Sequence, residues 1–401
     1  MKKIVSFTMV KNEADIVEYF VRYTANFAST LVFIDNGCFD GTIDILNKLK
    51  KEGFNIRIYN ESDVYYEQFR IENKYLHVLA NEDFDYIIPL DIDEFLAGDG
   101  NLLDILDTLN YNKVTIMKWK TYCVNGERIG EHLFQQNNIV RTGEESAFTK
   151  VIIPVELVKK TNMLMEMGHH NVLLPNEYKD LNDRLYVAHF PVRSIDQIRF
   201  KIYQGTVSQL MSSYKGVVAF HWKSMLEKIR IGQFDLIKYS REYALVNEDV
   251  KRVEYVEEDF DTSWCSTEIR TKYDDFINND IDKLLYTMNL ISCIKNITEY
   301  DVDKNRKPIL IYGIGNTLKN TIEKMDIAPF TVTAYIDSDE NKFLEKYNGK
   351  LIIAPEYIKF MKYEYIVVAS IYKEEIVDTL INYGINDEKV IDYRDFINLC
   401  L

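Results

Sequence analysis

The first ninety residues alternate between short apolar strands and amphipathic helices, and this alternation constrains the fold more than any other feature. The predicted elements, in chain order, are strand 3–10, helix 14–28, strand 31–35, helix 42–51, strand 55–59, helix 65–81 and strand 86–90. Repeated strand–helix units build a mostly parallel sheet that binds ligands beyond the carboxyl ends of its strands. Asn12, Asp35 and Asp91 each follow such a strand, so we expect a site there.

The rest of the chain divides into further parts, because 401 residues exceed the size at which a single core normally grows. Strands are predicted at 114–122, 148–154 and 185–190, in a half that we expect to shape the other side of the site. From 194 to 299 the pattern is helical, and strand–helix alternation restarts at 307. The sequence therefore predicts an α/β fold with a catalytic domain at 1–222, a helical connector at 223–304 and a second small α/β domain at 305–401.

Composition excludes several classes of function. The net charge of −15 repels polyanions, so no nucleic-acid partner is expected, although one nucleotide held through a cation is compatible. The five cysteines are scattered without a Cys-x-x-Cys pair, which indicates neither a disulfide framework nor a zinc site. No apolar stretch reaches the roughly 20 residues that span a bilayer. We therefore expect a cytoplasmic protein without a transmembrane segment.

Asp91-Ile92-Asp93 directly follows the predicted strand 86–90 and is the strongest candidate for chemistry. In an extended chain alternate side chains point to the same side, so the sequence predicts that both carboxylates can meet one ion. A hard divalent cation held by one or two carboxylates completes its shell with water and phosphate oxygens, as in a nucleotide-diphosphate site. The alternative is an acidic turn after a strand, which the flanking Leu90 and Phe95 disfavour.

Three motifs stand in order along this half: Lys11-Asn12-Glu13, then Asp35-Asn36-Gly37 with Asp40-Gly41-Thr42, and then Asp91-Ile92-Asp93-Glu94-Phe95. In this order the first 220 or so residues resemble the family 2 glycosyltransferases of the GT-A fold, in the branch with a Lys-Asn-Glu start and an Asp-x-Asp-Glu-Phe motif. The resemblance implies a nucleotide-diphospho-sugar transferase domain. It would move a hexose-type sugar, for example from a UDP-sugar, to a hydroxyl of a glycan, lipid-linked or protein acceptor.

The resemblance also implies a donor pocket, built from the loop after the first strand and the end of the second. Its members would be Val10, Lys11, Asn12, Glu13, Asp35, Asn36, Arg70, Asp91 and Ile92. Many family members have an aspartate at the position of Asn36, so the identity of the base stays open. Each residue also has a local interpretation: Asn12 as a helix N-cap, which is compatible with donor contact, Asp35 as part of a turn, and Arg70 as a solvated helix residue.

A later motif, Ala188-His189-Phe190-Pro191-Val192-Arg193-Ser194 followed by Gln197 and Lys201, is similar to the His-aromatic motif of the same branch. By this resemblance Asp91, Asp93 and His189 hold the metal, with Asp93 binding it directly. Arg193 and Lys201 would contact the diphosphate. An imidazole ligand favours Mn2+ over Mg2+, although Mg2+ is also compatible. The alternative for His189 is a histidine of the core.

Family members mostly invert, which requires a carboxylate that deprotonates the acceptor hydroxyl. The candidates are Glu144, Glu145, Glu166 and Asp183. We favour Glu166 as the catalytic base, because it lies close in sequence to His169 and His170, one of which we expect to line the site. His221-Trp222 is predicted to pack rather than to bind.

The last part of the chain carries its own motif. Gly313-Ile314-Gly315-Asn316 follows one predicted strand and Asp337 follows the next, a pattern typical of dinucleotide-binding turns. Leu318 stands where that pattern has its third glycine, which argues against a pyrophosphate site. The segment resembles the small Rossmann-like domains attached to sugar-modifying enzymes. We therefore expect a structural, acceptor-positioning or homo-oligomerising role.

Three other functions are alternatives to a glycosyltransferase. A sugar nucleotidyltransferase carries a Gly-x-Gly-x-Arg type of loop after its first strand, whereas residues 8–13 contain no glycine. A non-catalytic protein that binds nucleotide sugars is disfavoured by the intact Asp91, Asp93 and His189. A sugar-modifying enzyme that uses the last domain is the remaining alternative.

Overall fold

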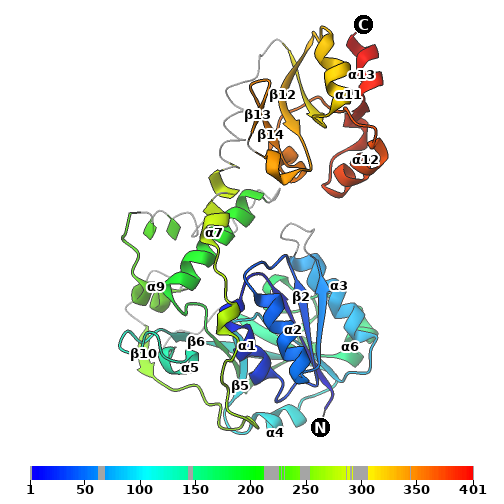
Figure 1. The fold of residues 1–401 in the computed structure, drawn as a ribbon. Helices are drawn as coiled ribbons and strands as arrows, with labels where there is room; N and C mark the ends of the chain where they lie inside the picture. The colour runs from blue at the N-terminus through cyan, green and yellow to red at the C-terminus, as the bar shows by residue number, and fades with distance from the viewer. Residues whose placement is uncertain are drawn as a thin grey trace. The chain divides into compact units, whose positions relative to one another are not determined.

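The computed structural model describes residues 2–61, 68–142, 148–211, 225–226, 228–229, 231–243, 253–285, 287–289, 291, 306–343 and 345–400. The chain forms two compact units, Met1–Ile281 and Asp282–Leu401, each with its own sheet (Figure 1). This division differs from the predicted boundaries, because residues beyond 222 complete the first unit. The strand β10 (Glu254–Glu257) pairs with its sheet, and the carbonyl of Phe276 lies against Gly41, where a Cβ would meet it at 1.9 Å.

The first unit is built on a ten-stranded sheet whose amino-terminal part is parallel, in the order β4-β1-β2-β3. Its strands are β1 (Ile4–Val10), β2 (Thr30–Asp35), β3 (Ile56–Asn60) and β4 (Tyr86–Pro89). The connecting helices are α1 (Ala14–Thr24), α2 (Thr42–Glu52) and α3 (Gln68–Ala80). Residues of α1 and α2 pack in one core cluster and residues of α3 in another, so helices cover both faces. The predicted α/β alternation is confirmed.

Further strands extend this sheet beyond β4. They are β5 (Glu94–Gly98), β6 (Val114–Cys123), β7 (Ile139–Thr142), β8 (Thr149–Pro154) and β9 (Lys179–His189). β8 lies antiparallel to β4, and β9 pairs with both β5 and β6. The helices of this region are α4 (Leu102–Asp107), α5 (Leu133–Gln136), α6 (Val155–Thr161), α7 (Ile195–Met211) and α9 (Leu236–Glu242). β9 and α7 carry His189 and Lys201, two residues of the candidate site.

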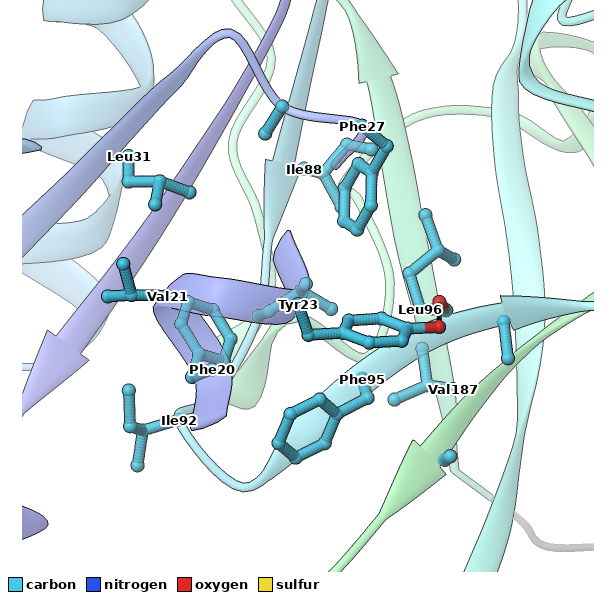
Figure 2. Packing of buried hydrophobic residues seen from close by; sticks show 14 of the residues in the cluster. Phe20, Val21, Tyr23, Phe27, Leu31, Ile88, Ile92, Phe95, Leu96 and Val187 are labelled. Atoms are coloured by element: carbon cyan, nitrogen blue, oxygen red, sulfur yellow. Dashed lines mark hydrogen bonds between the residues drawn. The ribbon is translucent and has the colours of Figure 1, made fainter. Parts of the chain in front are cut away.

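Aromatic and aliphatic side chains pack together in the larger core cluster of the first unit (Figure 2). Tyr23 of α1 is fully buried, and its hydroxyl donates to the carbonyl of Leu96 at 2.7 Å. Phe95 packs edge-on against Phe20 and Tyr23, with ring centroids 6.1 and 5.4 Å away. Because Phe95 lies in β5, two residues after Asp93, this packing anchors the Asp-x-Asp turn in the core.

The second unit is a six-stranded sheet in the order β13-β14-β12-β11-β15-β16. Its strands are β11 (Lys307–Tyr312), β12 (Phe330–Ile336), β13 (Lys346–Tyr347), β14 (Lys350–Ile353), β15 (Tyr365–Val368) and β16 (Val390–Asp392). Its α-helices are α11 (Asn316–Asn320), α12 (Lys373–Asn382) and α13 (Tyr393–Cys400). The predicted second α/β domain is confirmed, although the hairpin β13–β14 was not anticipated. Among the described residues, no helix is long and apolar enough to cross a membrane.

Candidate active site

The loop after β1 is fixed by the loop after β2. The backbone N–H of Glu13 donates to the Thr42 hydroxyl at 2.8 Å, and that of Ala14 donates to the Asp40 carboxylate at 2.9 Å. Asn12 has φ = 57°, and its side chain bonds Gln204 of α7 and the N–H of Phe39. The prediction of Asn12 as an N-cap was therefore wrong: the residue before α1 is Glu13, and side chains of the next loop satisfy the free amides.

Asp91-Ile92-Asp93 forms a turn between β4 and β5, not an extended segment. The N–H of Glu94 donates to the carbonyl of Asp91 at 3.0 Å, which closes the turn, so the two carboxylates do not share one side of a strand. The acidic-turn interpretation describes the backbone correctly. The turn sends Asp91 and Asp93 to different cationic partners.

Asp91 faces a buried lysine of β8. Lys150 is fully buried, and its ammonium donates to Asp91 at 2.8 Å and to the carbonyl of Gly168 at 2.7 Å. It also lies 2.9 Å from the fully buried Glu94. Burial raises the pKa of Glu94 to about 8, with Asp91 adding to the rise and Lys150 opposing it. Asp91 itself is partly exposed and so stays accessible to a ligand.

Asp93 is the centre of a second, more buried cluster. Lys201 of α7 donates to its Oδ2 at 3.0 Å, and Nε2 of His189, at the end of β9, lies 3.8 Å from its Oδ1. Burial alone would raise the pKa of Asp93, but the surrounding groups, Lys201 foremost, hold that pKa well below its ordinary value. Asp93 is therefore ionised at neutral pH.

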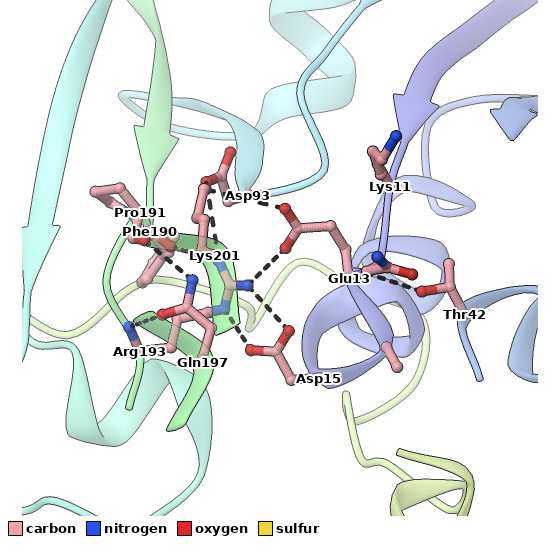
Figure 3. A network of polar contacts seen from close by, with 12 residues as sticks. Lys11, Glu13, Asp15, Thr42, Asp93, Phe190, Pro191, Arg193, Gln197 and Lys201 are labelled. Carbon is pink, nitrogen blue, oxygen red and sulfur yellow. Dashed lines mark hydrogen bonds and ion pairs between the residues drawn. The ribbon is translucent and has the colours of Figure 1, made fainter. Parts of the chain in front are cut away.

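Arg193 ties this cluster to α1 (Figure 3). Its guanidinium donates to Asp15 at 2.6 and 3.0 Å, to Glu13 at 2.7 Å and to the carbonyl of Phe190 at 3.2 Å. It is 2% exposed, and its NH1 lies 3.8 Å from Asp93. Because most of its donors are already used, Arg193 holds the segment after β9 onto the start of α1.

Two protonation states follow from this packing. Burial lowers the pKa of His189 to about 4, although Asp93 opposes the shift, so the imidazole is neutral at pH 7. Burial raises the pKa of Glu13 to about 7, against the opposing effects of Lys201 and Arg193. A neutral imidazole beside an ionised carboxylate is the state that a metal ion requires.

The geometry of Asp93 and His189 fits a shared divalent ion. Two ligand atoms that each lie about 2.1 Å from one ion are about 3 to 4 Å apart, which includes the 3.8 Å found here. His189 is also stacked on Trp119 at 4.5 Å, and its Nδ1 is buried without a hydrogen-bond partner among the described residues. Asp91 is held away by Lys150. Within the part of the chain that the structure describes, no three His, Cys, Asp or Glu side chains gather around one metal position.

The remaining predicted donor residues differ in their accessibility. Val10 and Ile92 are buried in the core, so only their backbones are available to a donor. Asp35 accepts from the N–H groups of Gly37 and Cys38 at 3.0 and 2.8 Å, as its turn interpretation predicts. Asn36 is buried and accepts from Lys11 at 3.4 Å. Arg70 is exposed on α3, and its role at the diphosphate stays a prediction.

The candidate base region lies after α6. Glu166 is half-buried and precedes the 3-10 turn Met167–His169, whereas Asp183 is exposed on β9. His169 is fully buried, with its Nε2 2.7 Å from Glu72, which is a structural contact. His170 is half-buried and packs on Trp119 with ring centroids 5.3 Å apart, in the same aromatic row as His189. Glu144, Glu145, His221 and Trp222 lie outside the described residues.

Three residues of the site escaped sequence reasoning: Lys150, Glu94 and Asp15. Lys150 opens the run Lys150–Pro154, which is otherwise apolar and buried, and a charge in such a run is a usable signal. Glu94 stood inside the motif but received no role. Asp15 lies in the first turn of α1, where an acid is favourable without any tertiary partner. Their importance depends on tertiary pairing, which sequence spacing does not show.

Comparison with known proteins gives one family match. Residues 305–391 match a family model described as C2185-like, N-terminal, which covers only part of the second unit. No curated protein matches the chain.

Several solved structures are similar to the chain, and three of them cover about 60% of it. S. aureus TarS 1-349 has a TM-score of 0.32 at 12% identity, over 62% of this chain and 77% of that one. GalNAc-T7 with UDP, GalNAc and Mn2+ has a TM-score of 0.32 at 8% identity, over 61% and 56%. The mannosyltransferase PcManGT from Pyrobaculum calidifontis, in complex with GDP-Man and Mn2+, has a TM-score of 0.29 at 10% identity, over 60% and 72%. All three TM-scores are below 0.5.

Proposed function

We propose that the first unit is a GT-A-type glycosyltransferase that takes a hexose-type sugar from a nucleotide-sugar donor. The acceptor would be a hydroxyl of a glycan, lipid or protein. The observation that carries the proposal is the convergence of Asp93, His189 and Lys201 beyond the ends of the parallel strands. They come from a turn, a strand end and a helix that are far apart in sequence, yet they form one charged, largely buried cluster. A purely structural fold gains little from burying such charges.

Asp93 and His189 would hold a divalent ion, preferably Mn2+. When bound, such an ion offsets the charge that develops on the leaving diphosphate. Lys201 now neutralises Asp93 at 3.0 Å, and its ammonium is free to turn to the phosphates once Asp93 is engaged elsewhere. The partly exposed Asp91 would accept from the ribose.

Arg193 and Glu13 act as positioning residues in this proposal, not as donor contacts. The guanidinium holds the segment after β9, and so the position of His189, relative to α1. Glu166 is the proposed base for inverting transfer, because it adjoins the 3-10 turn that carries His169 and leads to His170. Its carboxylate would take the proton of the acceptor hydroxyl as that oxygen attacks the sugar.

A screen of nucleotide sugars for hydrolysis, with Mn2+ and with excess chelator, tests the proposal. We expect hydrolysis of at least one donor with Mn2+ and its loss in chelator. Lys201→Met should separate two roles of the lysine: the affinity for Mn2+ alone should rise several-fold, because a competitor for Asp93 is gone, while UDP binding in the presence of Mn2+ should weaken at least tenfold. Tight binding of a nucleotide sugar without hydrolysis or transfer would favour a non-catalytic binding protein instead.

A further inference from the structure

The second unit contains a cavity that the proposed transferase reaction does not use. The cavity has a volume of about 810 Å³ and lies at the carboxyl ends of β11, β12 and β15. β11 sits between β12 and β15 in the sheet, so the strand order reverses direction there. In open parallel sheets, ligands bind in the crevice at such a reversal. The volume is within the 300 to 1,000 Å³ that is usual for small-molecule sites.

The turn after β11 is shaped to admit a ligand. Gly313 has φ = 97°, and a Cβ there would lie 3.1 Å from the carbonyl of Ala369, so the turn closely approaches the end of β15. Gly315 differs: a Cβ added to it would meet no atom within 4 Å, and its φ of −97° suits any residue. Gly315 lines the cavity, so the space that its side chain would fill belongs to the cavity.

The end of β12 contributes the polar wall. Asp337 lines the cavity and accepts from Lys342 at 3.0 Å and from the N–H of Asp339 at 3.0 Å. A carboxylate has about four lone-pair positions, so Asp337 keeps acceptor capacity. A carboxylate at the end of the second strand of such a sheet is placed to accept the hydroxyls of a ribose.

The charges of the cavity restrict the ligand further. Its ionisable lining residues, apart from tyrosines, are Asp337, Glu356, Glu375 and Lys342. The carboxylate of Asp337, which would accept the ribose hydroxyls, repels a phosphate placed on that ribose. Leu318, which replaces the third glycine of the dinucleotide pattern, is fully buried in the core of the unit and does not line the cavity. It therefore does not block a ligand.

We propose that this cavity binds a ribonucleotide through its free 2′,3′-diol, with Asp337 as the acceptor and the turn at Gly315 beside the phosphates. This chemistry is shared by NAD-type dinucleotides and by nucleotide sugars. The site is distinct from the one around Asp93 and needs no divalent ion.

Calorimetric titration of the full chain with NAD+, NADP+ and UDP-glucose, in excess chelator, tests this site while a metal-dependent donor site is silent. We expect NAD+ or UDP-glucose to bind, and NADP+ to bind at least tenfold more weakly than NAD+. Asp337→Asn should weaken binding at least tenfold. The matched control is Asp339→Asn, which removes a neighbouring acid that also lies 3.5 Å from Lys342 but does not line the cavity, and it should change binding less than twofold.

Gly315→Leu gives an independent test, because the backbone tolerates a side chain there and the side chain would fill the cavity. We expect it to abolish binding while the thermal unfolding curve is kept. Binding of NAD+ would identify the ligand as a dinucleotide, and binding of UDP-glucose alone would identify it as a nucleotide sugar. The proposal is overturned if neither ligand binds at millimolar concentration, or if Asp337→Asn leaves the affinity unchanged. Should Gly315→Leu fail to fold, the comparison of Asp337→Asn with Asp339→Asn still decides.

Discussion

The two units share an aspartate at the end of their second strand, but the sites around that aspartate differ. In both, an aspartate ends or follows the second strand and accepts backbone N–H groups of the next turn: Asp35 from Gly37 and Cys38, and Asp337 from Asp339. In the first unit, additional strands and α7 bring cations to this region and bury them with acids. In the second unit, the same region borders an open cavity.

In both units the parallel topology of the sheet sets the location of the site, whereas the elements added to the sheet set the chemistry of the site. Lys150, His189 and Lys201 come from β8, β9 and α7, which have no counterpart at the ends of β11 and β12. Lys150 and Lys201 place cations beside the acids of the first unit's site, and His189 adds a neutral imidazole. Without such additions, the second unit keeps an acidic wall suited to hydroxyl groups.

The largest expected effect is a loss of stability, and it tests whether the two units unfold independently. Phe95→Ala should lower the stability of the first unit by about 3 to 5 kcal/mol, because it removes a fully buried ring from an aromatic cluster. The matched variant in the second unit is Phe396→Ala, also fully buried. Calorimetric scans should show that each variant shifts a different transition. A shift of both transitions by either variant would show that the units unfold as one.

A smaller effect contrasts the ion pairs of the two units. Arg193→Met should cost about 2 to 3 kcal/mol, because it leaves the partly buried carboxylates of Glu13 and Asp15 without their cation. Lys342→Met removes the cation paired with Asp337, but this lysine is 41% exposed and the cost should stay below about 1 kcal/mol. Urea unfolding of both variants measures the contrast. Equal losses of unfolding free energy would mean that the ion pairs of Arg193 stabilise the fold no more than an exposed ion pair does.

The smallest effect is a pH dependence confined to the first unit. The folded pKa of Glu13, about 7, lies above its ordinary value of 4.5, so its favourable contribution is fully present below about pH 4.5 and is lost as the pH rises through 7. The stability of the wild type relative to Glu13→Gln should therefore fall over this range, by roughly 1 to 3 kcal/mol. Unfolding free energies of both proteins at pH 5 and pH 8 give the result. A difference that is independent of pH would contradict the shifted pKa.

Much of the fold followed from the sequence, because apolar periodicity reports which faces are buried. The strands at 3–10, 31–35 and 86–90 correspond to β1, β2 and β4. The turn at Asp91 was the disfavoured alternative, since an acidic tripeptide between apolar residues is compatible with both an extended chain and a turn. The partners of Asp91 and Asp93 could not be predicted either, because Lys150 and Lys201 reach them only through tertiary folding.

In the proposed site, Asp93 is the direct ligand of a divalent ion that holds a nucleoside diphosphate. The decisive measurement is calorimetric titration of UDP into the full chain with Mn2+, for the wild type, Asp93→Asn and Asp91→Asn, with thermal unfolding as a check on folding. Asp93→Asn should weaken binding about 100-fold or more, and Asp91→Asn should weaken it less, because its carboxylate is paired with Lys150 at 2.8 Å. Chelator should abolish binding to the wild type. Unchanged UDP affinity in folded Asp93→Asn, or in chelator, would contradict the account.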